Sequence, residues 1–357
     1  MSSERQPPIN NFSSSINIVL ATVHIVYVVL GVFPNALVFF VMIKAKKLRQ
    51  EPKNIILLVR TFVDGLQSAT ICPLPIAASF AGKWTAGYHG CIGYAFFTSW
   101  FGLTSILLNA LMVYERYFTL SKVPPRSLSH VFTYACIGAC YLAGFIVSCF
   151  PLLGWSSYGY EAMGYHCSVV WYSTDWIHAS FTIFLMVFFY AVPVTIILVA
   201  GCGVVRSVHR LHGVVKQISG TSSSISKAVF TTQVKATRLV AIMVAGFLIA
   251  WTPYGAFAVY AMTNENPPML VATLPSTFAK SSLVYNPLIY LFMYRKLRRG
   301  SIDLMQNIAS ELFGTTDSST GVKHTARLNS NRVGVQLIST TTPLPGTSSA
   351  FDDPTRN

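Results

Sequence analysis

Seven stretches of this chain are almost continuously apolar, and its polar residues collect between them. Each stretch is long enough to cross the hydrocarbon core of a bilayer as a helix, which takes about 20 residues. Lipid offers the backbone no hydrogen-bond partners, so a spanning segment must be helical. The pattern predicts an all-α membrane protein with a seven-transmembrane helix bundle over residues 18–293. The apolar stretches cover about 18–43, 54–79, 90–114, 131–153, 178–205, 236–262 and 269–293.

The two ends of the chain have different patterns. Residues 1–17 are polar and are expected to form an extracellular N-terminus. Residues 294–313 carry apolar side chains at near-helical spacing behind a basic cluster, which predicts a short amphipathic helix on the cytoplasmic membrane surface, weakened by Gly300. Residues 314–357 are rich in Ser, Thr, Gly and Pro and are expected to form a disordered cytoplasmic tail, either a phosphate acceptor or a plain spacer.

Composition and charge support a membrane location. Hydrophobic residues make up 52% of the chain and charged residues 11%, against about 25% charged in soluble proteins. Lys and Arg gather after the first, fifth and seventh stretches, whereas the opposite loops hold little beyond Lys83. The positive-inside rule therefore places the C-terminus in the cytosol. The net charge of +14 is explained by this topology and by contact with the lipid membrane, and no nucleic-acid partner is expected.

Lys280 is the only charged residue in the last apolar stretch. A charge at the membrane centre costs roughly 2.5–3.5 kcal/mol on insertion scales, so such a residue indicates a functional site. Burial favours the neutral, nucleophilic amine, which can condense with an aldehyde. The alternative, a lysine that reaches the membrane surface, is disfavoured by its distance from Tyr290 near the predicted inner face.

Several motifs resemble those of one receptor family. Residues 278–287 closely resemble the seventh helix of the opsins, where the lysine carries retinal as a Schiff base. Glu115-Arg116-Tyr117 resembles the Asp/Glu-Arg-Tyr motif of rhodopsin-like class A G-protein-coupled receptors. The resemblance spans residue 18 to about residue 313 and points to the non-visual opsin group, with encephalopsin-like, neuropsin-like and peropsin-like subgroups all open. It is further carried by Asn35, Asp64, Pro193, Trp251-Thr252-Pro253-Tyr254 and Asn286-Pro287 with Tyr290.

The resemblance implies a carboxylate that neutralises the Schiff base. Vertebrate visual pigments carry it three residues after the cysteine of helix three, where this chain has Tyr94, a phenol that is neutral at pH 7. Glu161, six residues before Cys167, resembles the counterion of invertebrate and many non-visual opsins. Tyr172 and Tyr254 occupy positions that hydrogen-bond this carboxylate in relatives. A solvated loop acid is the alternative.

The same resemblance implies a retinal cage and an activation path. Gly102 would leave room for the ring of retinal, and Trp251 and Tyr254 would form an aromatic wall, although plain core packing would also explain Trp251. Asp64 would belong to a buried polar network, as an ordinary hydrogen-bonded residue or beside a sodium ion; no other metal is expected. Activation and G-protein coupling would use Glu115, Arg116, Tyr117, Asn286, Pro287 and Tyr290.

Two covalent modifications are expected on the extracellular side. Cys91 opens the third apolar stretch and Cys167 lies in the loop before the fifth, and an oxidising compartment permits a disulfide between them. That bridge would hold the loop over the bundle. Asn11 begins the glycosylation sequon Asn-Phe-Ser.

Three functions remain open at this point. The leading one is a light-activated, bistable non-visual opsin in the plasma membrane that signals to a heterotrimeric G-protein and is not an enzyme. Arrestin and a receptor kinase would act on its Ser/Thr-rich tail. The others are a retinal photoisomerase of the opsin family and a chemically gated class A receptor, which Lys280 disfavours.

Overall fold

The computed structural model describes residues 14–122, 126–161, 163–171, 173, 175–219, 224–264 and 268–313. The chain divides into two compact units, Met1–Ala309 and Ser310–Asn357, and the helical bundle belongs to the first. The predicted N-terminal sequon at Asn11 and the predicted tail over residues 314–357 lie outside the described residues.

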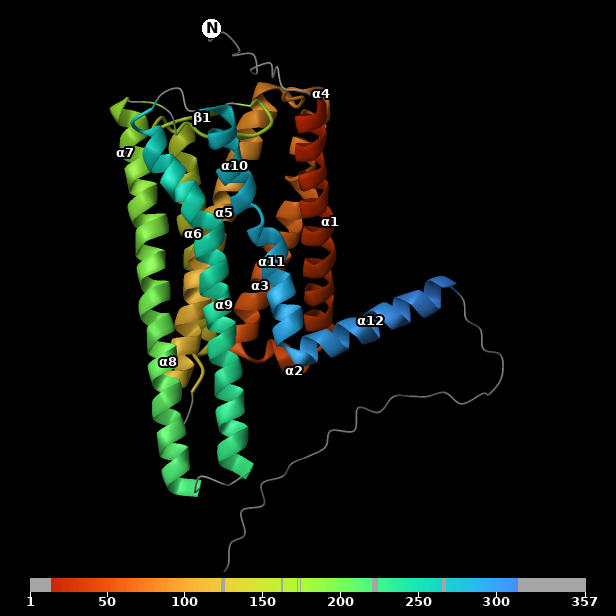
Figure 1. The fold of residues 1–357 in the computed structure, drawn as a ribbon, viewed down its shortest axis with the longest axis vertical. Helices are drawn as coiled ribbons and strands as arrows, with labels where there is room; N and C mark the ends of the chain where they lie inside the picture. Colours follow the sequence, from red (N-terminus) through yellow and green to blue (C-terminus); the bar gives the residue numbers. More distant parts are fainter. Residues whose placement is uncertain are drawn as a thin grey trace, which may run out of the picture. The chain divides into compact units, whose positions relative to one another are not determined.

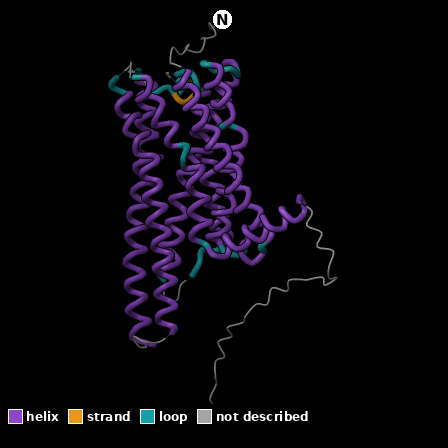
Figure 2. The backbone as a smooth tube through the Cα atoms, turned by 45° about the vertical axis from the view of Figure 1, so that its right-hand side comes forward, coloured by secondary structure: helices purple, strands orange, loops and turns teal. Residues whose placement is uncertain are grey.

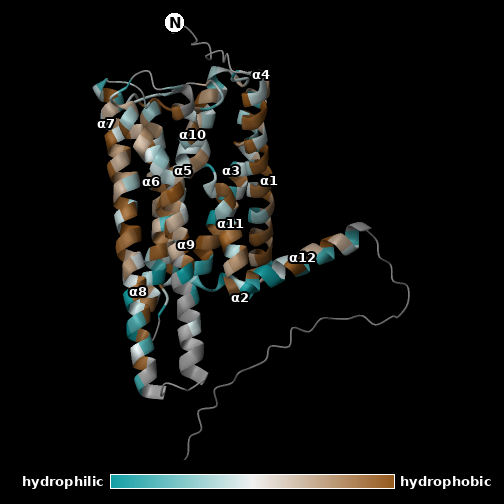
Figure 3. Ribbon diagram, in the orientation of Figure 1, coloured by the Kyte–Doolittle hydropathy of each residue, from teal (hydrophilic) through white to brown (hydrophobic). Residues whose placement is uncertain are grey.

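Seven helical passes run side by side, which confirms the predicted bundle (Figure 1). Apolar residues cover the middle of these helices, and polar residues increase toward one end of α8 (Val192–Ser219) and along α12 (Arg295–Phe313) (Figure 3). Most helices begin and end near the limits of their apolar stretches, because lipid offers the backbone no other hydrogen-bond partners. The fifth pass, however, continues to Ser219 and the sixth begins at Ser224, well outside the predicted stretches that end at 205 and begin at 236. The passes are α1 (Ser14–Lys44), α3 with α4 (Pro52–Thr70, Pro73–Ala81), α5 (Gly87–Ser121), α6 with η1 (His130–Cys149, Phe150–Leu152), α7 with η2 and α8 (Trp176–Leu185, Met186–Ala191, Val192–Ser219), α9 (Ser224–Ala261) and α10 with α11 (Met269–Ala279, Ser282–Met293).

The seventh pass is divided in the middle, which the sequence did not indicate. Six of the described passes are long and apolar enough to span a membrane, although the second also has a short turn at Ile71 and Cys72 between α3 and α4. The seventh is α10 followed by α11, with a turn at Lys280 and Ser281 between them. In this turn the Leu283 amide donates to the Lys280 carbonyl oxygen at 3.1 Å. The turn therefore places Lys280 at a helix end inside the bundle.

The fifth pass contains a π-helical turn, η2, which ends at Ala191, two residues before Pro193. Proline has no amide hydrogen to donate one turn back, so the helix must adjust around it. Tyr190 lies in this wider turn, and its hydroxyl donates to Thr252 Oγ1 at 2.8 Å. The turn thus connects the fifth pass with α9.

A small hairpin covers the N-terminal end of the bundle (Figure 2). Its antiparallel strands β1 (Tyr158–Tyr160) and β2 (Cys167–Val169) pair Tyr160 with Cys167. Cys167 is bonded to Cys91 at the start of α5, with 5.4 Å between their Cα atoms. The predicted disulfide is confirmed, and it fixes the hairpin against the third pass.

The short helix after the bundle is present as α12 (Arg295–Phe313), in agreement with the prediction; its place on a membrane surface stays a prediction. A short helix α2 (Lys46–Arg49) was not foreseen. Gly300 has a role other than weakening α12. A Cβ atom at that position would lie 2.8 Å from Val41 Cγ1 on α1, so only glycine permits this close approach. Leu297 is buried in the same apolar cluster as Val41.

Candidate functional site

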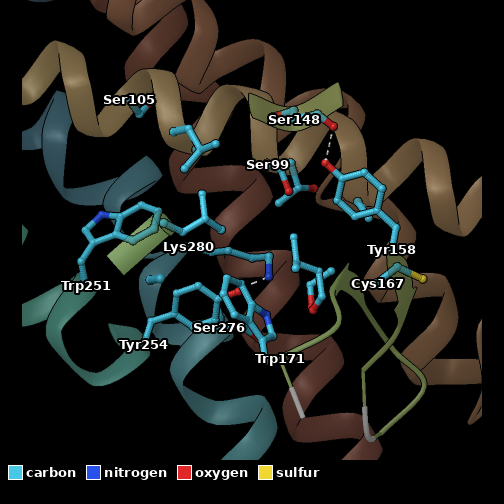
Figure 4. Close-up of a pocket in the computed structure, with 18 of the residues that line it drawn as sticks. Ser99, Ser105, Ser148, Tyr158, Cys167, Trp171, Trp251, Tyr254, Ser276 and Lys280 are labelled. Carbon is cyan, nitrogen blue, oxygen red and sulfur yellow. Dashed lines mark hydrogen bonds between the residues drawn. The ribbon is translucent and has the colours of Figure 1, made fainter. Parts of the chain in front are cut away.

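The bundle encloses a cavity beneath the hairpin. About 900 Å³ of its space is not filled by atoms, part of it open to solvent. Figure 4 shows the Lys280 amine among the lining residues, with Trp251 and Tyr158 at opposite ends of the view. The structure brings together five residues that the sequence singled out from four different segments, namely Gly102, Glu161, Trp251, Tyr254 and Lys280.

The Lys280 amine is held by its own helix. Its Nζ donates to the Ser276 carbonyl oxygen at 3.4 Å, one turn earlier in α10 (Figure 4). Among the described residues, no carboxylate lies within 4.0 Å of this Nζ. An amine in a cavity without a contacting anion has little to stabilise its charged form. It is therefore placed to react as a nucleophile.

Glu161 is buried, with 5% of its surface exposed. The hairpin positions it: its amide donates to the His166 carbonyl oxygen at 2.9 Å, and its own carbonyl oxygen accepts from the Gly164 amide at 2.8 Å. Ser276 Oγ donates to Glu161 Oε2 at 3.0 Å. Burial raises the pKa of the Glu161 carboxyl, and the opposing effects of Lys280 and Ser276 are smaller.

Two histidines extend this group, and both were missed by the sequence reasoning. His166 Nδ1 lies 3.7 Å from Glu161 Oε2, and His166 Nε2 lies 2.9 Å from His24 Nε2 on α1. Both imidazoles are almost completely buried. A usable signal was present, since His24 interrupts the first apolar stretch and His166 directly precedes the disulfide cysteine.

Tyr94, at the counterion position of visual pigments, and Tyr172, a predicted hydrogen-bond partner of Glu161, do not line the described part of the cavity. Tyr94 is buried, with its ring centroid 5.2 Å from that of Trp84 and 6.4 Å from that of His166. It is not among the described residues that line the cavity. Tyr172 lies outside the described residues.

Aromatic rings form one wall of the cavity. The Trp251 ring lies 6.3 Å from Phe247 and 6.4 Å from Tyr254, and Trp171 of the loop lies 5.4 Å from Tyr254. A Cβ atom at Gly102 would lie 3.7 Å from Trp251 Cη2, so the glycine leaves space directly beside the indole. A single amine, a buried carboxylate and an apolar aromatic wall fit retinal, an elongated apolar aldehyde.

Asp64 has a cationic partner from its own helix. Arg60 Nε lies 3.3 Å from Asp64 Oδ2, and both side chains are 1% exposed. Arg60 Nη1 donates to the Ser105 carbonyl oxygen at 3.0 Å, and Ser105 Oγ donates to Asp64 Oδ1 at 3.1 Å. The sequence reasoning left open an ordinary hydrogen-bonded residue or a sodium site here and did not consider Arg60, although its position four residues before Asp64 puts both on one helix face.

Arg116 of α5 contacts its neighbour Glu115 and also a tyrosine at the end of the seventh pass. Its Nε lies 3.8 Å from Glu115 Oε2, and Thr119 Oγ1 donates to Glu115 Oε1 at 2.9 Å. Arg116 Nη2 donates to the hydroxyl of Tyr294, directly after α11, a partner that the sequence reasoning missed. The predicted Tyr290 instead directs its hydroxyl to Met112 Sδ at 3.6 Å.

The remaining motif residues are also placed by the bundle. The Tyr117 ring packs where Gly203 of α8 has no side chain, since a Cβ there would overlap the ring. Asn286 and Pro287 are buried in α11. Asn35 of α1 donates to the Leu283 carbonyl oxygen at 3.0 Å, close to the turn at Lys280.

Comparison with known proteins agrees with this arrangement. The profile of the 7 transmembrane receptor (rhodopsin family) matches residues 34–290. The blue-sensitive opsin of Gallus gallus is 33% identical over 288 residues, which cover 78% of this chain and 76% of that opsin. This chain belongs to the opsin family of class A G-protein-coupled receptors.

Other similar proteins support the same assignment. This opsin is 30% identical over 300 residues to the visual pigment-like receptor peropsin of Mus musculus, with 83% of this chain and 86% of peropsin covered. The crystal structure of squid rhodopsin superimposes with a TM-score of 0.76 at 23% identity, covering 84% of this chain and 88% of that structure. This opsin is therefore a multi-pass membrane protein with the rhodopsin fold.

Proposed function

We propose that this opsin is a light-activated G-protein-coupled receptor that binds retinal covalently through a Schiff base at Lys280. The observation that carries the proposal is the position of the Lys280 Nζ inside an apolar cavity that it shares with the buried Glu161. When bound, retinal supplies the absorption of light and the isomerisation. The relatives named as opsins and visual pigment-like receptors support this proposal.

Glu161 would serve as the counterion, and Tyr94 would not. Glu161 lines the cavity and accepts from Ser276, whereas Tyr94 is absent from the described lining residues. A carboxylate held by the hairpin would stay in place whatever the shape of the ligand. We therefore propose that the Schiff base keeps its proton after light absorption and that the pigment is bistable, as a non-visual opsin would be.

The signal would pass along α9 to the opposite end of the bundle. A group that fills the space at Gly102 would contact Trp251, which stacks against Phe247, so a change in the shape of that group would act on the indole. Pro253 interrupts the hydrogen bonding of α9 at this level, so the helix can pivot there. An outward movement of α9 would free Arg116 for a G-protein.

Orientation and partners follow from the charge pattern. We propose that the hairpin end faces the outside of the plasma membrane and that the basic end faces the cytosol, where the heterotrimeric G-protein binds. Arrestin and a receptor kinase would act on the Ser/Thr-rich residues 314–357.

Substitution of Lys280 tests the proposal. Lys280→Ala should reach the cell surface and form no visible pigment with retinal, whereas Lys83→Ala, at an exposed position, should form pigment normally. Acid denaturation should trap the wild-type adduct as a protonated Schiff base. A light-sensitive pigment in Lys280→Ala would refute the attachment site.

Extraction of retinal before and after illumination distinguishes a receptor from a photoisomerase. A receptor should retain its retinal and activate a G-protein in light. Release of the 11-cis isomer without G-protein activation would instead support the photoisomerase.

A further inference from the structure

The two buried histidines form a hydrogen-bonded chain whose protons can be counted. The Leu20 carbonyl oxygen can only accept, so His24 Nδ1, 2.7 Å away, must carry a hydrogen. A neutral His24 then accepts at Nε2, and His166 must donate its Nε2 hydrogen across the 2.9 Å contact. A neutral His166 is left with a bare Nδ1, and this atom faces Glu161 Oε2.

With His166 neutral and Glu161 ionised, no hydrogen lies between His166 Nδ1 and Glu161 Oε2. A nitrogen lone pair and a carboxylate oxygen repel each other, whereas one added proton turns the contact into a hydrogen bond. Their separation of 3.7 Å is longer than a hydrogen bond, which is usually about 2.7–3.2 Å, so we expect the added proton to draw the two atoms together. Burial lowers the pKa of His166 and raises the pKa of Glu161, which places the proton on the carboxyl.

The surrounding groups do not supply this proton. On the α10 side, Lys280 Nζ is hydrogen-bonded to the Ser276 carbonyl oxygen. Cys72 lies near Lys280, at the start of α4. Tyr94 of α5 faces His166, and Tyr27 of α1 lies beside His24 with ring centroids 6.2 Å apart. On the hairpin, Cys167 is in the disulfide and cannot titrate. Among the described residues, the Glu161 carboxyl and the Lys280 amine line the cavity, and the two imidazoles lie behind Glu161.

We propose that His24, His166 and Glu161 form a proton store, which holds one proton on Glu161 in the retinal-free protein and supplies it to the Schiff base. This inference rests on the proposed attachment of retinal to Lys280. It assigns a function to the two histidines, which would otherwise be a buried polar pair without a role.

The proton balance of attachment shows why a store is useful. The neutral Lys280 amine forms a double bond to the aldehyde carbon, and the aldehyde oxygen leaves as water with both amine hydrogens. A protonated Schiff base therefore requires one additional proton. If Glu161 gives up its proton, the reaction creates the cation and its counterion together, and no proton has to enter the buried site from solvent. Before attachment, the same proton leaves Lys280 in its nucleophilic form.

Infrared spectroscopy of the retinal-free receptor tests the store directly. At neutral pH, the difference spectrum between wild type and Glu161→Gln should show the C=O band of a protonated carboxylic acid. His166→Asn should replace this band with carboxylate bands, because the amide hydrogens stabilise the ionised form. The exposed His130→Asn is the matched control and should keep the acid band. Carboxylate bands in the retinal-free wild type would overturn the proposal.

Proton uptake during pigment formation provides a second measurement. In weakly buffered solution with a pH indicator, the wild type should form pigment without taking up a proton. His166→Asn should take up one proton per pigment, and His24→Asn should shift in the same direction if His166→Asn does not fold. Uptake of one proton per pigment by the wild type would overturn the store.

The two proposals fail in different ways. If Lys280 were not the attachment site, Lys280→Ala would form pigment while the infrared result could stand. If only the store were wrong, a Lys280-dependent pigment would form in a protein whose Glu161 is already ionised.

Discussion

Ser276 donates its hydroxyl proton to Glu161 at 3.0 Å, from the same residue whose carbonyl oxygen lies 3.4 Å from Lys280 Nζ. One serine thus orients the amine and the carboxylate, and these two groups make no direct ion pair within 4.0 Å. The arrangement leaves space on the cavity side of the amine, where the aldehyde carbon of a ligand has to approach.

Removal of the Glu161 carboxylate should change the spectrum of the pigment. In Glu161→Gln the Schiff base loses its counter-charge, so its pKa falls and the proton is lost as pH rises through the lower value. Dark absorption at neutral pH should move from the visible toward the near ultraviolet, and acid or added chloride should restore it. A spectrophotometric pH titration measures the effect.

Tyr94→Phe is the matched control for this titration. Because Tyr94 is not among the described lining residues, its loss should change the spectrum only slightly. An unchanged Schiff-base pKa in Glu161→Gln, or a large fall of that pKa in Tyr94→Phe, would show that Glu161 is not the counterion.

The stability of the retinal-free protein should depend on the protonation of Glu161. Its pKa is raised in the folded protein, so the stability that it contributes is present at low pH and is lost as pH rises through the folded pKa. The loss is about 1.4 kcal/mol for each unit by which the folded pKa exceeds the unfolded one. Thermal unfolding from pH 5 to pH 9 should show this decline in wild type and a smaller one in Glu161→Gln. Identical pH profiles would contradict the prediction.

The pairing of Arg60 with Asp64 leads to a prediction about sodium. A guanidinium 3.3 Å from the carboxylate already supplies the positive charge that a sodium ion would bring. We therefore expect the melting temperature of the wild type to be the same in sodium chloride and in choline chloride at equal ionic strength.

Arg60→Leu should create a sodium-dependent protein. The variant leaves a buried carboxylate unpaired, which typically costs about 3–5 kcal/mol. Sodium at ten times its dissociation constant would then restore about 1.4 kcal/mol. The double variant Arg60→Leu with Asp64→Asn removes the charge and should show no sodium effect. Sodium stabilisation of the wild type would contradict the assignment.

The bond between Arg116 and Tyr294 should restrain the receptor in the dark. Hydrogen bonds to charged groups are worth about 1.5–3 kcal/mol, so Tyr294→Phe should raise G-protein activation in the dark roughly tenfold or more. Tyr134→Phe is a suitable control because Tyr134 is exposed on α6. A G-protein assay on dark membranes measures the change, and equal dark activity in both variants would exclude a restraining role.

The sequence by itself determined the membrane fold and the seven passes, and it predicted the importance of Lys280. These properties are local: a segment of sufficient length and apolarity must form a helix in lipid, and a lone charge within it carries a known cost. Motif spacing also indicated Glu161, Gly102 and the pairing of Cys91 with Cys167. The carboxylate was identified by its offset from a cysteine and not by its distance from the amine.

Only the tertiary structure decided which side chains meet. His24 and His166 are 142 residues apart in sequence, and their 2.9 Å contact depends on how α1 is rotated against the hairpin. The bridge from Ser276 to Glu161 likewise joins residues 115 positions apart. Helix rotation and loop position are set by the sum of many weak packing contacts across the bundle. The sum cannot be inferred from any single residue, so the neighbours of Glu161 are known only when all the helices are packed together.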